Sequence, residues 1–307
     1  MALSRDLSAP PVIIEAAING ARTMADNPNV PLAAQEIVDC ITACVEAGAS
    51  VIHMHAGQPI VGAGGHHDSA MYRDVFMPAL QRHPGLLIYP TLPGGGPGTT
   101  MQQRLSHVRG LAEMGLAGPV PVDPGTMNLG RIGRRGRPPA NSHVYQTTFA
   151  DVDWAFRFCN QAGLPCTLSA FEPGFVRLVE AHRRAGTLPA AAIVKLEFGA
   201  DEVLFGLKPG LRGLEAWLDL FDGDALAWMV SLRDGDVNDL LAGLAIERGG
   251  HVRVGIEDYR GPAMPRNEEL VAATVRIARG LGRRPALPDE VRGLITVNFR
   301  CSQERKE

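Results

Sequence analysis

Two histidines separated by a single residue are the clearest candidates for chemistry in this sequence. They are His53 and His55, in the apolar segment 50–55 (SVIHMH), which has the character of a buried strand. Residues i and i+2 of a strand point to the same side, so both imidazoles can reach one point. Imidazole nitrogen is a common ligand of Zn²⁺. The pair therefore predicts either a divalent metal site or two histidines that are hydrogen-bonded at the end of a strand.

A second candidate is the segment 251–258 (HVRVGIED), an apolar strand that ends in two adjacent carboxylates. The alternation of a strand places Arg253, Gly255 and Glu257 on one side. If that side is internal, Arg253 needs an acidic partner, and Asp258 can provide one. Glu257 could then join the two histidines as a third metal ligand and leave a position open for substrate. The alternative is a charged loop with a surface salt bridge, although an arginine within an apolar strand argues against it.

Further polar residues fall at the ends of other predicted strands. Glu15 follows a run of apolar residues, and alone it would more often be a structural carboxylate. Thr91 precedes the loop 94–98 (GGGPG), whose glycines permit close approach of the backbone to a ligand. Asp123 ends a predicted strand, whereas Asn128 has no independent support from its surroundings.

These candidates belong to a chain that alternates short apolar segments with amphipathic ones. The predicted strands cover residues 11–17, 50–55, 85–91, 119–123, 166–170, 190–198, 225–231 and 251–256. The predicted helices cover residues 32–47, 69–82, 101–114, 149–162, 174–185, 211–220, 237–247 and 267–281. Eight strand–helix pairs predict an α/β fold, a (β/α)₈ TIM barrel, whose active site lies at the carboxyl ends of the strands.

The barrel is expected to form a single domain over residues 1–307, with a polar C-terminal tail from about residue 301. A doubly wound open sheet is the main alternative. That fold would favour a glycine-rich phosphate loop after the first strand, and the segment 15–20 (EAAING) does not match one.

Composition restricts the class of protein. The chain has 307 residues, 45% hydrophobic and 21% charged, with a formal net charge of −3. These values predict a folded globular protein, exclude a disordered chain and argue against nucleic-acid binding through a basic surface. Five cysteines without a CxxC pair indicate free thiols in a reducing compartment. We expect no signal peptide and no membrane span, and hence a cytoplasmic location.

The motifs together resemble the β-keto acid cleavage enzymes, whose founding activity is the cleavage of 3-keto-5-aminohexanoate. The resemblance runs nearly from end to end of the chain, and the block 249–258 together with the HMH segment is highly specific. The matching segments are residues 17–20 (AING), 47–55 (AGASVIHMH), 125–128 (GTMN), 171–174 (FEPG), 249–258 (GGHVRVGIED), 267–271 (NEELV) and 277–282 (IARGLG).

The resemblance implies a (β/α)₈ barrel, usually a homotetramer, with one Zn²⁺ per subunit. The metal ligands of the family match His53, His55 and Glu257. A catalytic arginine–aspartate pair matches Arg253 and Asp258, and the glutamate of the first strand matches Glu15. The implied reaction transfers an acyl group between a β-keto acid and the co-substrate acetyl-CoA, and it yields acetoacetate and a new acyl-CoA.

The same resemblance indicates where the substrate binds. Hydroxyl residues that contact substrate in the family match Thr91 and a position near Asp123, where this chain has a carboxylate. Asn128 lies in the matching GTMN segment, and Ser169 lies near the position of a glutamate that members commonly carry. Members also often continue the HxH pair with Val-Arg-Asp, where this chain has residues 56–58 (AGQ). We therefore expect the chemistry of the family with a different acid as substrate.

Two other functions remain open from the residues. One is a zinc-dependent retro-aldolase or hydrolase that does not use CoA. The other is a non-catalytic protein that binds a metal or small molecule, although binding alone requires neither Arg253 nor Asp258.

The basic loop 131–139 (RIGRRGRPP) is either a solvated surface loop or a clamp for phosphates. If it is a clamp, Arg131, Arg134, Arg135 and Arg137 could contact the phosphates of CoA.

Overall fold

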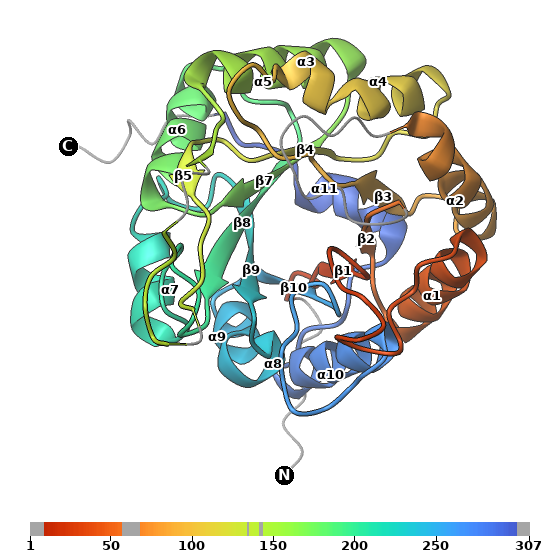
Figure 1. Cartoon of the computed structure of the whole chain (residues 1–307). Coiled ribbons are helices and arrows are strands. Elements are labelled where there is room, and N and C mark those ends of the chain that lie inside the picture. Colours follow the sequence, from red (N-terminus) through yellow and green to blue (C-terminus); the bar gives the residue numbers. More distant parts are fainter. Residues whose placement is uncertain (1–8, 57–67, 134, 141–143, 300–307) are drawn as a thin grey trace.

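Eight strands of the computed structural model form one sheet that curves into a ring (Figure 1). The structure describes residues 9–56, 68–133, 135–140 and 144–299, so the predicted tail from residue 301 lies outside it, as do Gly57, Gln58 and Arg134. The strands are β1 (Ile14–Ala17), β2 (Val51–Met54), β3 (Leu87–Pro90), β4 (Val120–Val122), β7 (Cys166–Ala170), β8 (Ala192–Gly199), β9 (Ala227–Arg233) and β10 (His251–Val254).

The strand order confirms the predicted (β/α)₈ barrel. All pairings within the sheet are parallel, in the order β3-β2-β1-β10-β9-β8-β7-β4. This order follows the sequence around a ring, whereas a doubly wound sheet reverses its direction partway. The two ends of the order, β3 and β4, lie side by side, since Gly118 just before β4 packs against the carbonyl of Ile88 in β3.

Helices surround the ring of strands (Figure 1). They are α1 (Ala34–Ala47), α2 (Ser69–Arg82), α3 (Met101–Arg104), α4 (Ser106–Glu113), α5 (Phe149–Ala162), α6 (Pro173–Arg184), α7 (Leu211–Leu218), α8 (Val237–Leu240), α9 (Ala242–Glu247) and α10 (Asn267–Gly280). The predicted helices 101–114 and 237–247 are each divided in two. The divisions fall at Leu105 and Leu241, which leave helical geometry and are buried in the core. In the described parts of the chain, no helix combines the length and apolar character that a membrane crossing requires.

Helix α5 shows how local sequence sets the bounds of an element. Its first turn carries a capping box, in which the hydroxyl of Thr148 accepts from the Asp151 amide and the Asp151 carboxylate accepts from the Thr148 amide. Gly163, with a φ of 64°, ends the helix in the left-handed conformation. The helix buries one apolar side against the barrel, formed by Val152, Ala155, Phe156 and Cys159.

The shortest elements were not predicted, because two to four residues are too few to show the hydrophobic periodicity of a strand or helix. Strands β5 (Met127–Asn128) and β6 (Val144–Tyr145) form a small antiparallel pair between β4 and α5. Near the C-terminus, the 3₁₀ turn η1 (Pro288–Glu290) leads into α11 (Val291–Leu294), which lies across the end of the barrel (Figure 1). Helix α11 covers an apolar layer inside the amino-terminal end of the barrel, made by Ile13, Val51, Leu87, Ile193 and Met229.

We predict that the seam between β3 and β4 requires glycine at position 118. A Cβ there would lie 2.1 Å from the carbonyl oxygen of Ile88, a backbone atom that cannot move freely. Gly118→Ala should lower the free energy of unfolding by about 1–3 kcal/mol, as overpacked sites do. Gly280→Ala is the control, because a Cβ there meets no described atom within 4 Å. It should be neutral or stabilise by up to about 1 kcal/mol. Urea denaturation measures both, and equal stabilities would contradict the prediction.

Candidate active site

Charged and polar side chains fill the barrel above its apolar layer. The ammonium of Lys195 on β8 donates to the hydroxyl of Tyr89 on β3 at 2.8 Å, and Tyr89 donates to Glu15 on β1 at 2.6 Å. Arg253 on β10 also donates to Glu15, at 2.8 Å. Strands β8 and β3 are not neighbours in the sheet, so Lys195 and Tyr89 meet through the interior. Arg253 therefore points into the interior of the barrel.

Arg253 is the centre of this interior network. Its side chain is almost fully buried and forms ion pairs with three carboxylates. The distances are 2.8 Å from Nη1 to Glu15, 2.9 Å from Nη2 to Glu257 and 2.6 Å from Nε to Asp258. Burial alone would raise the pKa of Glu15, but Lys195 and Arg253 hold it below its ordinary value. Glu15 therefore stays ionised inside the barrel and neutralises the cations around it.

Asp258 is held by two arginines. Arg253 Nε contacts its Oδ2 at 2.6 Å, and Arg233 Nη1 contacts its Oδ1 at 2.5 Å. Ser231 donates a longer hydrogen bond to Oδ2, at 3.4 Å. Arg233 also pairs with Glu197 at 3.3 Å and with Glu257 at 3.2 Å, and these contacts restrict its own orientation. The carboxylate of Asp258 is thus fixed in position at the carboxyl end of β10.

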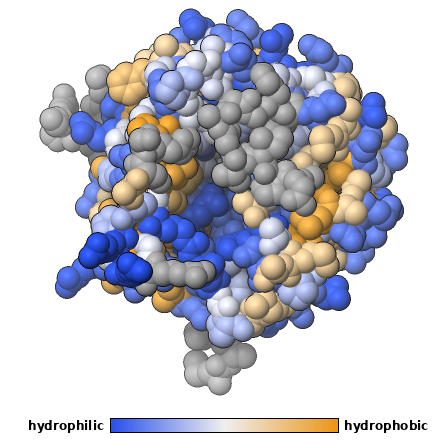
Figure 2. Space-filling model, viewed as in Figure 1, coloured by the Kyte–Doolittle hydropathy of each residue, from blue (hydrophilic) through white to orange (hydrophobic). Residues whose placement is uncertain are grey.

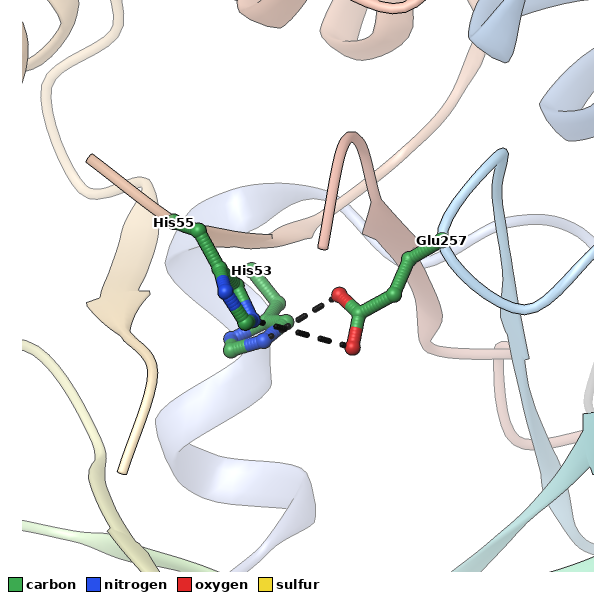
Figure 3. Close-up of side chains that lie close together, drawn as sticks. All are labelled: His53, His55 and Glu257. Carbon is green, nitrogen blue, oxygen red and sulfur yellow. Dashed lines mark ion pairs between the residues drawn. The ribbon is translucent and has the colours of Figure 1, made fainter. Parts of the chain in front are cut away.

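The three predicted metal ligands converge at the same end of the barrel. His53 is in β2, His55 follows it, and Glu257 follows β10 (Figure 3). Their candidate ligand atoms all lie within 4.8 Å of one another. Nε2 of His53 is 3.3 Å from Glu257 Oε2, and Nε2 of His55 is 3.8 Å from Oε1. Gly20 permits this placement of Glu257, because a Cβ on residue 20 would lie 2.2 Å from Cγ of Glu257.

The protonation states of these residues suit a metal. Burial lowers the pKa of His53, which favours the neutral imidazole. Burial alone would raise the pKa of Glu257, but Arg253 holds it well below its ordinary value. Metals bind neutral imidazole and ionised carboxylate. Among the described residues, Glu257 Oε2 is buried without a hydrogen bond, and a cation would satisfy it. The residues present therefore fit a divalent metal ion.

The charges inside the barrel also favour a cation. Four carboxylates and three basic groups form one ion-paired set. The carboxylates are Glu15, Glu197, Glu257 and Asp258, and the basic groups are Lys195, Arg233 and Arg253. With the imidazoles neutral, this set has one net negative charge, and a divalent ion would change it to one net positive charge. The net positive charge of the site would then be balanced by a ligand with a single carboxylate. Figure 2 shows a hollow with hydrophilic walls at the centre of this face.

Thr91 and Asp123, two predicted substrate contacts, lie at the ends of β3 and β4. Thr91 is half-buried, and its carbonyl oxygen is 2.9 Å from Nε2 of His107. The carboxylate of Asp123 accepts a short hydrogen bond from the hydroxyl of Tyr145, which in turn accepts one from the buried Arg104. Asp123 is therefore oriented by a chain of side chains from α3 and β6.

The other two predicted substrate contacts lie in different surroundings. Ser169 is buried and pairs in register with Lys195, so both side chains face the barrel interior. Asn128 is exposed on β5, in the small antiparallel pair outside the main sheet. The structure thus brings Ser169 into the interior layer and leaves Asn128 away from it.

Sequence reasoning missed several residues of this network, namely Tyr89, Lys195, Glu197 and Arg233. A signal for two of them was present. Lys195 and Glu197 occupy alternate positions of the apolar strand predicted at 190–198, which is the pattern that identified Arg253 and Glu257. Arg233 lies two residues beyond the predicted end of its strand, at residue 231, and continues the same alternation.

The chain is similar to several proteins of known activity or structure. A 3-keto-5-aminohexanoate cleavage enzyme of Fusobacterium nucleatum subsp. nucleatum is 28% identical over 93% of this chain and 98% of its own length. A 3,5-dioxohexanoate:acetyl-CoA acetone transferase of Paraburkholderia graminis is 25% identical over 93% of this chain and 96% of its own. The solved ternary complex of ObcA with C4-CoA adduct and oxalate is 17% identical. It has a TM-score of 0.62 over 87% of this chain and 67% of that chain, and it supports the fold alone.

The resemblance inferred from the motifs is confirmed over nearly the whole sequence. The sequence model of the beta-keto acid cleavage enzymes matches residues 11–297. The protein therefore belongs to the β-keto acid cleavage enzyme family.

Proposed function

We propose that this protein is a zinc-dependent β-keto acid cleavage enzyme, which condenses a β-keto acid with acetyl-CoA to give acetoacetate and a new acyl-CoA. The observation that carries the proposal is the convergence of His53, His55 and Glu257 beside the fixed carboxylate of Asp258. Family membership and the acetyl-CoA transferase named among the relatives support the reaction type.

Each residue of the site has a role in this proposal. His53, His55 and Glu257 hold one Zn²⁺ per subunit, which would act as a Lewis acid on the keto group when bound. Asp258 is the general base, and Arg253 and Arg233 hold its carboxylate in one orientation. Glu15 balances the charge of Arg253 and fixes the hydroxyl of Tyr89.

The reaction then proceeds by exchange of two acyl groups. Asp258 removes a proton from C2 of the β-keto acid, between its keto and carboxylate groups. The C2 carbanion forms a bond to the carbonyl carbon of acetyl-CoA, and CoA leaves as a thiolate. The thiolate then attacks the original keto carbon and breaks its bond to C2. Asp258 returns the proton to C2, so that acetoacetate and the new acyl-CoA leave the site.

The substrate is an anion whose side chain is read by residues at the ends of β3, β4 and β7. The proposed contacts are Thr91, Asp123 and Ser169, with Asn128 farther out in the segment between β4 and α5. Tyr145 and Arg104 fix the direction of the Asp123 carboxylate, which suits a hydrogen-bond donor on the substrate. We also propose a single domain, a homotetramer and a cytoplasmic location.

We predict that Glu257 is needed for the metal. Glu257→Ala removes one of the three ligands, so affinity for zinc should fall by at least about 100-fold. Plasma emission spectroscopy on the purified protein should show about one zinc per wild-type chain and little in the variant. Glu113→Ala, on the exposed surface of α4, is the control and should keep the metal. A variant at position 257 that is folded by circular dichroism and retains a full complement of zinc would contradict this assignment.

We predict that Asp258 is needed for turnover but not for the metal. Asp258→Asn should lower kcat/KM by about 10²–10⁴-fold, as loss of a general base does, while zinc remains bound. The assay follows acetoacetate from a panel of β-keto acids with and without acetyl-CoA. Asp39→Asn, exposed on α1, is the matched control. Cleavage that proceeds equally well without acetyl-CoA would favour the retro-aldolase or hydrolase alternative, and zinc without any turnover would favour a binding protein.

A further inference from the structure

Three arginines surround one aspartate beside the active site. Asp234, just after β9, contacts Arg22 at 3.1 Å, Arg131 at 3.0 Å and Arg260 at 3.9 Å. The aspartate side chain is largely buried, whereas Arg131 and Arg260 are 39% and 50% exposed. We call these four residues the arginine cluster. A single carboxylate cannot neutralise three guanidinium groups, so the cluster has positive charge available for a ligand.

The cluster is assembled from four separate connections at the carboxyl ends of the strands. Arg22 follows β1, Asp234 follows β9 and Arg260 follows β10, while Arg131 comes from the long segment between β4 and α5. That segment crosses to the connection after β8, where the Ile132 amide donates to the carbonyl of Glu202 at 2.8 Å. The carboxyl ends of the strands form the active-site face of a (β/α)₈ barrel.

The cluster is joined directly to the proposed catalytic residues. Arg22 Nε donates to the carbonyl of Glu257 at 3.1 Å, and the amide of Asp234 donates to the carbonyl of Asp258 at 2.9 Å. Asp234 has a φ of 60°, and it is the one non-glycine residue with positive φ in the described part of the chain. Such backbone strain concentrates at functional sites, where surrounding contacts maintain it.

The chemistry of the cluster favours phosphate groups. Guanidinium groups bind phosphate oxygens with paired, charge-assisted hydrogen bonds. Two exposed carboxylates lie at the edge, where Glu202 pairs with Arg131 at 3.3 Å and Asp26 lies near Arg22. Ion pairs that are exposed to solvent contribute little free energy, so a phosphate can compete with them. A pocket between the connections after β1 and β10 adjoins Arg22 and Arg260, and its remaining lining includes Asp26, Ile256 and Met264. There is thus room for a ligand next to the guanidinium groups of Arg22 and Arg260.

We infer that the arginine cluster binds the phosphate groups of the CoA co-substrate. The inference rests on the proposed function, because it takes acetyl-CoA as the second substrate. Asp234 acts as a positioning residue that holds the three arginines in one orientation at the rim. The phosphates bind there while the thioester reaches inward toward Asp258. Of the arginines in the basic loop 131–139, this inference assigns Arg131 to the phosphates of CoA. It adds Arg22 and Arg260, which lie in other connections.

The test compares acetyl-CoA with acetyl-pantetheine, which carries the same thioester without the diphosphate and the 3′-phosphate. The variant is Arg131→Gln combined with Arg260→Gln, two exposed side chains whose loss should not unfold the protein. Arg82→Gln is the matched control, since Arg82 is similarly exposed and pairs with Asp39 on the outer helices. Calorimetry of the zinc-loaded protein gives the Kd for CoA independently of turnover.

The double variant should bind CoA at least about tenfold more weakly than wild type does, because charge-assisted contacts are lost. The preference for acetyl-CoA over acetyl-pantetheine in kcat/KM should fall by a similar factor, and the control should match wild type. If wild type uses both thioesters and the variant affects them equally, or affects KM for the β-keto acid instead, the inference fails and the proposed function stands. If wild type uses neither thioester, both fail.

Discussion

A buried arginine that is shared by three carboxylates holds the interior of this barrel together. Charges inside a protein are stable only when they are paired, and removal of one partner leaves the other uncompensated at a cost of about 3–5 kcal/mol. Arg253 pairs with Glu15 from β1 and with Glu257 and Asp258 from the end of its own strand. The apolar layer covered by α11 seals the barrel below this network. Charge and chemistry are therefore confined to the open end.

Just after β10 the chain passes close to β1, and there the adjacent residues Glu257 and Asp258 have different environments. Gly255 has a φ of 146°, and a Cβ there would lie 2.1 Å from the carbonyl oxygen of Ala17. The close approach at this glycine lets the chain turn, so that Glu257 faces the histidines and Asp258 faces Arg253 and Arg233. One carboxylate can then serve as a ligand and its neighbour as a base. Gly20 completes the arrangement from the β1 side.

Much of this architecture could be predicted from local patterns. Alternation within apolar segments identified the strands, placed His53 and His55 on one side of a strand, and grouped Arg253 with Glu257. Contacts between distant segments could not be predicted in this way. The partnership of Lys195 with Tyr89 depends on how the ring of strands closes, and α11 is too short to show periodicity. The arginine cluster likewise joins residues from four connections, and their proximity exists only in the folded chain.

The proposed function depends on one step, in which the fixed carboxylate beside the metal ligands removes a proton from C2 of a β-keto acid. Proton nuclear magnetic resonance in D₂O tests it most directly, with the zinc-loaded protein, a β-keto acid that it cleaves, and no acetyl-CoA. We expect the C2 hydrogens to exchange for deuterium faster than in protein-free solution, without net cleavage of the acid. Exchange at the uncatalysed rate, under conditions where the acid saturates the site, would show that this carboxylate is not the base.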